Sequence, residues 1–239
     1  MNTEFKIIKT DKKGNIEKAA IMGAKAYYTK FQQPSVIYDQ KDLPRNKQTH
    51  FEYTVELLVS EDTADSYDEH FPKQASKKMT KQQVMKKFKA ESDEDLEEIG
   101  IDPKQKKFYF IKKVQAAQKK DGTALPKQLR PRVVEVIDNK PVDVTFDKLV
   151  GNGSGVDCLL RVSQNTTYGS FSYPAVLKVT DMIEYKASGN GGVDEETQDF
   201  LGGDLEFADE PEDNKQQVHE EEFEEEIPFD TDDSDDDEY

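Results

Sequence analysis

Apolar and polar residues alternate over several short segments between the N-terminus and residue 185. From Phe51 to Val59 every second residue is apolar, so these side chains would share one face of a strand. Gly23 lies inside the longest of these segments and predicts a bulge or sharp bend, which lets one strand serve two sides of a barrel. Turn residues separate the predicted strands, which cover residues 5–8, 19–31, 51–59, 108–114, 133–137, 142–146, 156–162 and 173–185.

The pattern becomes helical over about residues 73–103. Thr80 and Gln83 have the spacing of a capping box, in which the Thr side chain and the Gln side chain satisfy each other's backbone N–H groups. Ser92 is a second helix start, and Gly100 is typical of a residue that follows a helix end. The sequence therefore predicts a helical insertion between strands, with its apolar stripe used for packing.

The charge is divided unevenly along the chain. Its 239 residues have a net charge of −17, but residues 187–239 hold 23 Asp and Glu against one lysine, a net charge of −22. The first 186 residues hold 32 Lys and Arg against 27 Asp and Glu, a net charge of +5. An acidic segment this poor in apolar residues cannot bury enough surface to fold. We expect a mildly basic domain at residues 1–186 and a disordered acidic tail at residues 187–239.

Several classes of protein are excluded by composition. Cys158 is the one cysteine, so the chain forms no internal disulfide, which suits a reducing cytoplasm. The first 13 residues hold no apolar stretch of signal-peptide length, and no apolar run approaches a membrane span. Three histidines and one cysteine lack the spacing of a zinc site. We expect no metal site, no cofactor and no membrane partner.

The glycine-rich run at residues 151–155 invites comparison with a phosphate-binding loop. It lacks the Lys and Ser or Thr that complete a P-loop, and a predicted strand follows it in place of a helix. Glycines without side chains allow a close backbone approach. We interpret the run as a tight approach to a strand, where a ligand backbone could come close.

Basic residues are interleaved with aromatic residues in the predicted β domain. Single-stranded DNA requires this mixture, because cations neutralise phosphates and flat rings stack unpaired bases at ~1–3 kcal/mol per base. Alternation leaves open which rings stack bases and which belong to the core, although Phe51 and Tyr53 fall on the apolar face. The candidate nucleic-acid contacts are Lys25, Tyr27, Tyr28, Lys30, Phe31, Lys112, Lys113, Lys127, Arg130, Arg132, Tyr168 and Phe171.

Apolar residues are set among the acidic residues of the tail. They are Phe223, Ile227, Phe229 and Tyr239. Charge that steers and rings that anchor are typical of a docking peptide, so these residues are candidate contacts to a partner protein. A solubilising tail with incidental apolar residues is the alternative.

These features together resemble the phage-encoded single-stranded DNA-binding proteins of the short-tailed-phage replication type. The resemblance is carried by residues 130–134, by the Gly-Asn-Gly-Ser loop at residues 151–154 with the strands that follow, and by the acidic tail that closes on Tyr239. It implies a mainly β, OB-fold-like barrel that binds single-stranded DNA without sequence preference in phage DNA replication, recombination and repair. It also implies action in the cytoplasm of the infected bacterial host, and a tail that competes with DNA and recruits a polymerase, helicase or primase.

Residues 224–229 are also similar to the tip of bacterial single-stranded DNA-binding proteins. There the Pro-Phe pair ends the chain, whereas here ten residues follow Phe229. This difference argues against docking to the host pockets that read such a tip.

Two other classes of function remain. One is an acidic protein-interaction module, such as a DNA mimic or a chaperone-like protein, which does not bind DNA. The other is a nuclease, which would need a carboxylate cluster drawn from Asp138, Asp143, Asp147 and Asp157. Their spacing is typical of strand ends and turns, so we expect no enzyme. A homodimer is left open.

Overall fold

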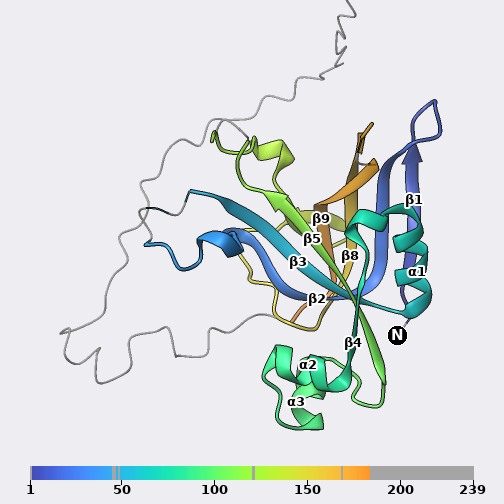
Figure 1. Cartoon of the computed structure of the whole chain (residues 1–239), viewed down its shortest axis with the longest axis vertical. Coiled ribbons are helices and arrows are strands. Elements are labelled where there is room, and N and C mark those ends of the chain that lie inside the picture. The colour runs from blue at the N-terminus through green and yellow to red at the C-terminus, as the bar shows by residue number, and fades with distance from the viewer. Residues whose placement is uncertain (1, 45–46, 48, 120–121, 168, 184–239) are drawn as a thin grey trace, which may run out of the picture. The chain divides into compact units, whose positions relative to one another are not determined.

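The computed structural model describes residues 2–44, 47, 49–119, 122–167 and 169–183 (Figure 1). The chain divides into two units, Met1–Ser188 and Gly189–Tyr239, and all described residues belong to the first. The predicted disordered tail, residues 187–239, lies outside the described residues.

The described residues are mainly strands, as predicted. They also include three α-helices and three single turns of 3-10 helix. In chain order the elements are β1 (Glu4–Thr10), β2 (Ile16–Val36), η1 (Tyr38–Gln40), β3 (Phe51–Val59), α1 (Glu61–His70), η3 (Pro72–Gln74), β4 (Lys77–Thr80), α2 (Lys81–Phe88), α3 (Asp93–Glu98), β5 (Lys107–Ala116), η4 (Lys127–Leu129), β6 (Arg132–Ile137), β7 (Lys140–Asp143), β8 (Ser154–Asn165) and β9 (Gly169–Asp181).

The long strand β2 pairs antiparallel with three other strands, β1, β3 and β8. It bends at Gly23, which has a φ of +65° and lies where the pairing with β8 shifts register between Ile21 and Ala24. The N–H of Gly23 donates to Asp157 Oδ1 of β8 at 2.9 Å. The predicted bulge at this glycine is confirmed, and it lets one strand contribute to both sides of the sheet.

Five strands form a partly open barrel of the OB type, in the order β5-β3-β2-β8-β9 (Figure 1). The two end strands of this set, β5 and β9, share no hydrogen-bonded ladder, and side chains close the seam between them. The Ser172 N–H of β9 donates to Gln74 Oε1 of η3 at 2.7 Å. Lys113 Nζ of β5 donates to Ser172 Oγ at 2.7 Å and to its carbonyl at 3.2 Å. Side-chain bonds therefore satisfy groups that a ladder would satisfy in a closed barrel.

The alternating segments put their apolar faces into one core. From β3, Tyr53, Val55, Leu57 and Val59 point inward, as the period of two predicts, and Phe51 packs at the edge of the same cluster. The core is completed by residues of the other barrel strands, among them Ile21, Ile111, Val156, Leu160 and Leu177.

An insertion between β3 and β5 carries the helices. α2 begins at the predicted capping box of Thr80 and Gln83, and α3 begins at the predicted helix start Ser92, where Asp95 completes a second capping box. Val84 and Leu96 of these helices pack with Tyr27 of β2 in a second buried cluster. The helical insertion is therefore confirmed, and its apolar stripe is a packing face.

The insertion differs from the prediction in two places. Residues 77–80 form strand β4, which pairs with β5, where a helical segment was expected. The insertion also begins earlier, because α1 occupies residues 61–70, ahead of the predicted start at about 73. α1 is largely polar, and its buried residues are only Thr63, Ala64 and Tyr67. Its apolar face is therefore too narrow for the sequence pattern to predict a helix there.

The glycine-rich loop at residues 151–155 packs against both the insertion and strand β2 of the barrel. Gly153 has a φ of +89°, and a Cβ at this position would collide with the backbone carbonyl of Ile99, just after α3. The Gly153 N–H donates to the Ala26 carbonyl of β2 at 2.9 Å. The same Ile99 carbonyl accepts a bond from Tyr27 Oη at 3.0 Å. The close approach expected at this loop therefore exists, but its partner is the protein's own backbone and not a ligand.

We expect Gly153→Ala to destabilise the protein more than Gly14→Ala. Both glycines have a strongly positive φ, so alanine costs about 1–2 kcal/mol of backbone strain at either position. Only at Gly153 does the new methyl group also overlap the Ile99 carbonyl, whereas Gly14 has open space around it. The measurement is the free energy of unfolding of both variants in urea. Equal losses would contradict the close docking of the loop on the insertion.

Candidate nucleic-acid interface

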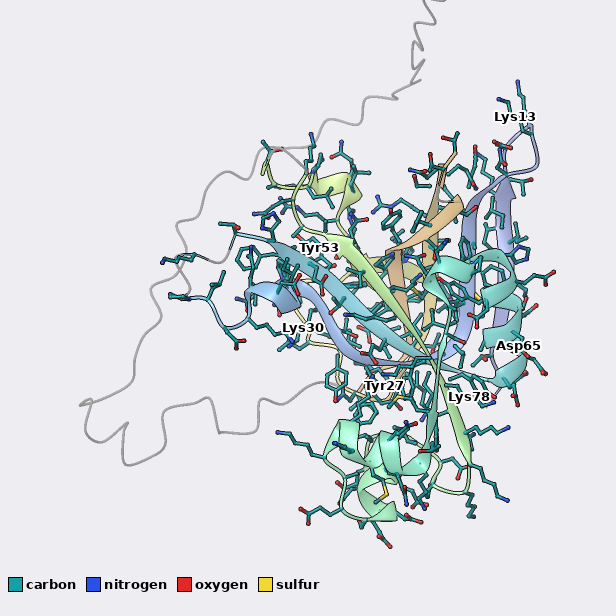
Figure 2. All side chains as sticks on the ribbon, viewed as in Figure 1. Lys13, Tyr27, Lys30, Tyr53, Asp65 and Lys78 are labelled. Carbon is teal, nitrogen blue, oxygen red and sulfur yellow. The ribbon has the colours of Figure 1, made fainter. Side chains whose placement is uncertain are left out.

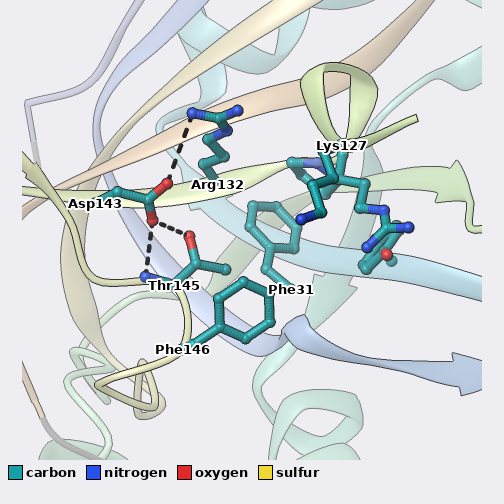
Figure 3. Close-up of a pocket in the computed structure, with 9 residues that line it drawn as sticks. Phe31, Lys127, Arg132, Asp143, Thr145 and Phe146 are labelled. Carbon is teal, nitrogen blue, oxygen red and sulfur yellow. Dashed lines mark hydrogen bonds and ion pairs between the residues drawn. The ribbon is translucent and has the colours of Figure 1, made fainter. Parts of the chain in front are cut away.

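A cleft of about 390 Å³ opens between β2, β3 and the segment that runs from η4 to the residues after β7 (Figure 3). Four predicted site residues, which come from two separate parts of the chain, meet in it. They are Phe31, Lys127, Arg130 and Arg132, and the other lining residues are Tyr53, Pro131, Asp143, Thr145 and Phe146.

The loop that carries the basic residues is held by bonds to backbone carbonyls. Arg130 Nε donates to the Leu125 carbonyl at 2.8 Å. Arg161 of β8 donates to the carbonyl of Leu129 and, at 3.5 Å, to that of Gln128. These bonds fix η4 beside the barrel and leave the Lys127 side chain exposed at the cleft.

One carboxylate lies among the three cations of the cleft. Asp143 Oδ2 faces Arg132 Nη1 at 3.7 Å, with about half of each side chain exposed (Figure 3). Asp143 also accepts bonds from the Thr145 N–H at 3.0 Å and from Thr145 Oγ1 at 2.5 Å. An exposed ion pair of this length contributes little free energy, so Arg132 can exchange its carboxylate for a phosphate at small cost. Lys127 and Arg130 add positive charge without a neighbouring acid among the lining residues.

Phe146 presents an open aromatic surface to the cleft. Its side chain is 69% exposed, more than any other large hydrophobic residue in the described part of the chain. Its carbonyl accepts a bond from Gln32 Nε2 of β2 at 2.7 Å, which ties the turn to the barrel. Figure 3 shows the Phe146 ring beside that of Phe31, which, with Tyr53, belongs to the buried core below. An exposed phenyl ring above a basic cleft is suited to stacking on a base.

Sequence reasoning did not select Phe146. The sequence pattern predicts Phe146 as the last residue of a strand at 142–146. In the structure β7 ends at Asp143, and Phe146 lies in the turn that follows. The available signal was its position between polar residues in the run Val144-Thr145-Phe146-Asp147-Lys148.

Three predicted contacts are wrong because the side chains are buried. Phe31 is only 2% exposed, at the base of the cleft. Tyr27 is fully buried among the residues of the insertion, with its ring 5.0 Å from that of Phe88 (Figure 2). Lys113 is fully buried at the seam of the barrel, where its ammonium group also donates to Tyr67 Oη. Strand alternation does not reveal the burial of Tyr27 or Lys113, because the insertion covers the face of β2 that carries Tyr27 and because the inner face of β5 carries a lysine.

The remaining predicted contacts lie outside the cleft. Tyr28 and Lys30 are exposed on β2, Lys25 and Phe171 are half-buried, and Lys112 is exposed on β5, where its ammonium group lies 3.7 Å from Glu52. Tyr168 and the tail residues Phe223, Ile227, Phe229 and Tyr239 lie outside the described residues.

The aspartates weighed for a nuclease are spread over turns and strand edges. Asp157 accepts the Gly23 N–H and faces Lys178 at 3.6 Å, and Asp143 holds Thr145. Among the described residues, no three His, Cys, Asp or Glu side chains gather as a metal site would require. None of the described helices combines the length and the apolar composition needed to span a bilayer.

Comparisons with known proteins give matches by structure alone. No family model and no curated protein matches the chain. The chain is similar to the single-stranded DNA-binding protein from bacteriophage Enc34, solved in complex with ssDNA, with 14% identity, a TM-score of 0.36 and coverage of 70% of this chain and 88% of that one. It is also similar to gp2.5, a single-stranded DNA-binding protein encoded by bacteriophage T7, with 13% identity, a TM-score of 0.36 and coverage of 91% and 99%.

Burial lowers the pKa of Lys113 from its ordinary value to about 7. The same burial raises the pKa of Tyr67, which accepts its bond, and raises the pKa of the neighbouring Cys158 thiol to about 12. Because the unfolded chain keeps the ordinary lysine pKa, it binds more protons than the folded chain between about pH 7 and pH 10. The cost of burying this side chain is therefore largest at or below pH 7 and decreases as the pH rises.

We expect the stability of the wild type relative to Lys113→Met to rise between pH 7 and pH 10. Methionine has a similar length and no charge, so the difference between the two proteins isolates the titration of Lys113. The gain should amount to several kcal/mol, at about 1.4 kcal/mol per unit of pKa difference. The measurement is urea unfolding of both proteins at several pH values, and parallel pH curves would contradict a neutral buried lysine.

Proposed function

We propose that the chain binds single-stranded DNA without sequence preference, as its resemblance to phage replication proteins implies. The observation that carries the proposal is the cleft, where Lys127, Arg130 and Arg132 surround an exposed Phe146 ring. Cations hold the phosphates, and the ring stacks a base that no complementary strand covers. Neither kind of contact reads the identity of the base, so the binding is tolerant of sequence.

The electrostatic part of this binding depends on salt. Each phosphate that a cation neutralises releases condensed counterions, so the affinity falls as salt rises. The side chains of Lys127 and Arg132 are exposed enough to meet a phosphate, and the lining residues contain three cations against one carboxylate. A duplex hides the base faces that Phe146 would contact, which makes the site selective for single strands.

The tail completes the mechanism. With 23 acidic residues against one lysine, residues 187–239 present a polyanion tethered to a basic domain. Treated as a flexible coil, a segment of this length would span roughly 40 Å root-mean-square and further with self-repulsion, which would be enough to reach the cleft of its own domain. DNA would displace it and free its apolar residues for a polymerase, helicase or primase during phage replication or recombination in the host cytoplasm.

Replacing Phe146 by alanine should weaken binding to a labelled poly-thymidine oligonucleotide roughly five- to a hundred-fold. This is the loss of one stacked base, about 1–3 kcal/mol. Fluorescence anisotropy of the full chain, at low and moderate salt and with a duplex as competitor, gives the affinities. The control is Ile8→Ala on β1, which removes an apolar side chain that is also exposed, at 53%, and does not line the cleft.

Equal affinities for the wild type and Phe146→Ala would exclude Phe146 as a base platform. If the wild type binds no single strand at any salt concentration, the DNA-binding proposal fails. The acidic protein-interaction module would then be the remaining class.

Removal of residues 187–239 should strengthen binding to the same oligonucleotide, most at low salt. The reason is that the tail and DNA compete for one basic surface, and salt screens the tail as it screens DNA. A matched control keeps the tail length and replaces its Asp and Glu by Asn and Gln, which separates charge from excluded volume. Unchanged affinity after removal would contradict the competition.

A further inference from the structure

The C-terminal end of α2 meets the outer surface of β2 at Tyr28, beside the cleft but outside it. The rings of Tyr28 and Phe88 are stacked, with centroids 5.3 Å apart and planes 6° from parallel. Phe88 also contacts Tyr27 and Phe110, which anchors it to the second buried cluster. The insertion therefore fixes the Phe88 ring in place, while 38% of Tyr28 remains exposed.

The Tyr28 side chain is held in place from both ends. Its backbone N–H donates to Asn152 Oδ1 at 2.9 Å, and its hydroxyl donates to the Lys87 carbonyl at 3.2 Å. Its φ is +50°, a strained value for a bulky residue, and the pairing of β2 with β3 shifts register directly after Tyr27. This local irregularity turns Tyr28 outward although Tyr27 is buried. A ring held in this way loses little conformational entropy when it stacks on a ligand.

The lysines around Tyr28 divide into one that is used within the fold and three that are available. Lys87 forms an ion pair with Glu56, mostly out of solvent, and lies over the Phe110 ring at 4.7 Å, so it stabilises the insertion. Lys86 on the last turn of α2, Lys89 at its C-cap and Lys30 on β2 are exposed. None of these three forms an ion pair with another described residue. Their charges are free to meet an anion.

The strand that carries Tyr28 leads directly to the cleft. Lys30 and Gln32 line a second depression of about 320 Å³ together with Leu149, and Gln32 holds the Phe146 carbonyl. Gln32 follows Tyr28 by four positions along the strand, about 13 Å at 3.3 Å per residue. Tyr28 and Phe146 therefore mark two ends of one track along the outer side of β2.

We propose that the helical insertion supplies a second single-strand subsite: Tyr28, backed by Phe88, stacks a base, and Lys30, Lys86 and Lys89 neutralise the adjoining phosphates. The proposal rests on the proposed DNA-binding function and extends it from the cleft to the insertion. An aromatic pair with unpaired cations nearby favours a nucleic acid over an acidic peptide, because a single strand offers a flat ring beside every phosphate, whereas a peptide offers one only at its scattered aromatic residues.

The test compares poly-thymidine oligonucleotides of increasing length, from about 4 to 16 nucleotides, the range of site sizes for OB folds. The full chain is titrated as wild type, as Tyr28→Leu, as Tyr28→Phe and as the double variant Lys86→Gln/Lys89→Gln. The short oligonucleotides fill the cleft alone, and the long ones reach the insertion. The double variant changes exposed side chains only, and a thermal melt checks that each protein is folded.

For the long oligonucleotides we expect Tyr28→Leu to lower the affinity about five- to a hundred-fold, with little change for the short ones. Tyr28→Phe keeps the ring and should bind as the wild type does. The double variant should also lose affinity for the long oligonucleotides alone, and its salt dependence should be shallower. The matched control is Lys104→Gln/Lys106→Gln, which removes two exposed charges before β5, at the opposite end of α2, and should leave the length profile unchanged.

Three results would overturn the second subsite. One is an unchanged length profile in Tyr28→Leu, and another is equal losses in Tyr28→Leu for short and long oligonucleotides. The third is tighter DNA binding by the double variant, which would assign these lysines to the acidic tail. Failure of the wild type to bind any oligonucleotide is a different result, since it removes the proposed function itself.

Discussion

The continuous backbone of β2 is the constraint on which the rest of the structure depends. One strand pairs with β1, β3 and β8, so it must turn from one side of the barrel to the other without a chain break. Two positive-φ positions, Gly23 and Tyr28, make this possible. Ile21 and Ala26 then face the barrel core, while Tyr27 enters the cluster of the insertion. The strand thereby joins the two cores, and its outer side connects the insertion to the cleft.

The basic residues of the barrel have two separate roles: one is buried and bonds the backbone, and others face solvent. Between β5 and β9 the ladder is missing, and Lys113 with Gln74 satisfies the groups of Ser172 at the cost of desolvating an ammonium group. That lysine is unavailable to any ligand. The cations that line the cleft come instead from the loop before β6, and exposed lysines also lie at the end of α2. A basic residue of this chain can therefore be structural, as Lys113 is, or available to a ligand, as the cations of the cleft are.

Patterns of local origin predicted the elements well. The alternation of β3, the capping box of α2 and the helix start at Ser92 depend on a few neighbouring residues, and the structure confirms them. The prediction missed α1, whose apolar face is narrow. It also extended a strand to Phe146, past the end of β7. It also failed for Tyr27, because the insertion covers that face of β2 and no pattern of neighbouring residues encodes this packing.

The sequence by itself determined the mainly β class, the helical insertion, the bend at Gly23 and the charge contrast between domain and tail, because each depends on composition or short-range periodicity. Only the tertiary structure decided which residues share a surface. Phe31, Lys127 and Arg132 meet because β2 and the loop before β6 converge, and Tyr28 meets Phe88 because the insertion folds back on the barrel. The same packing buried Lys113, since contacts between distant segments set exposure and a residue's own neighbours in sequence do not.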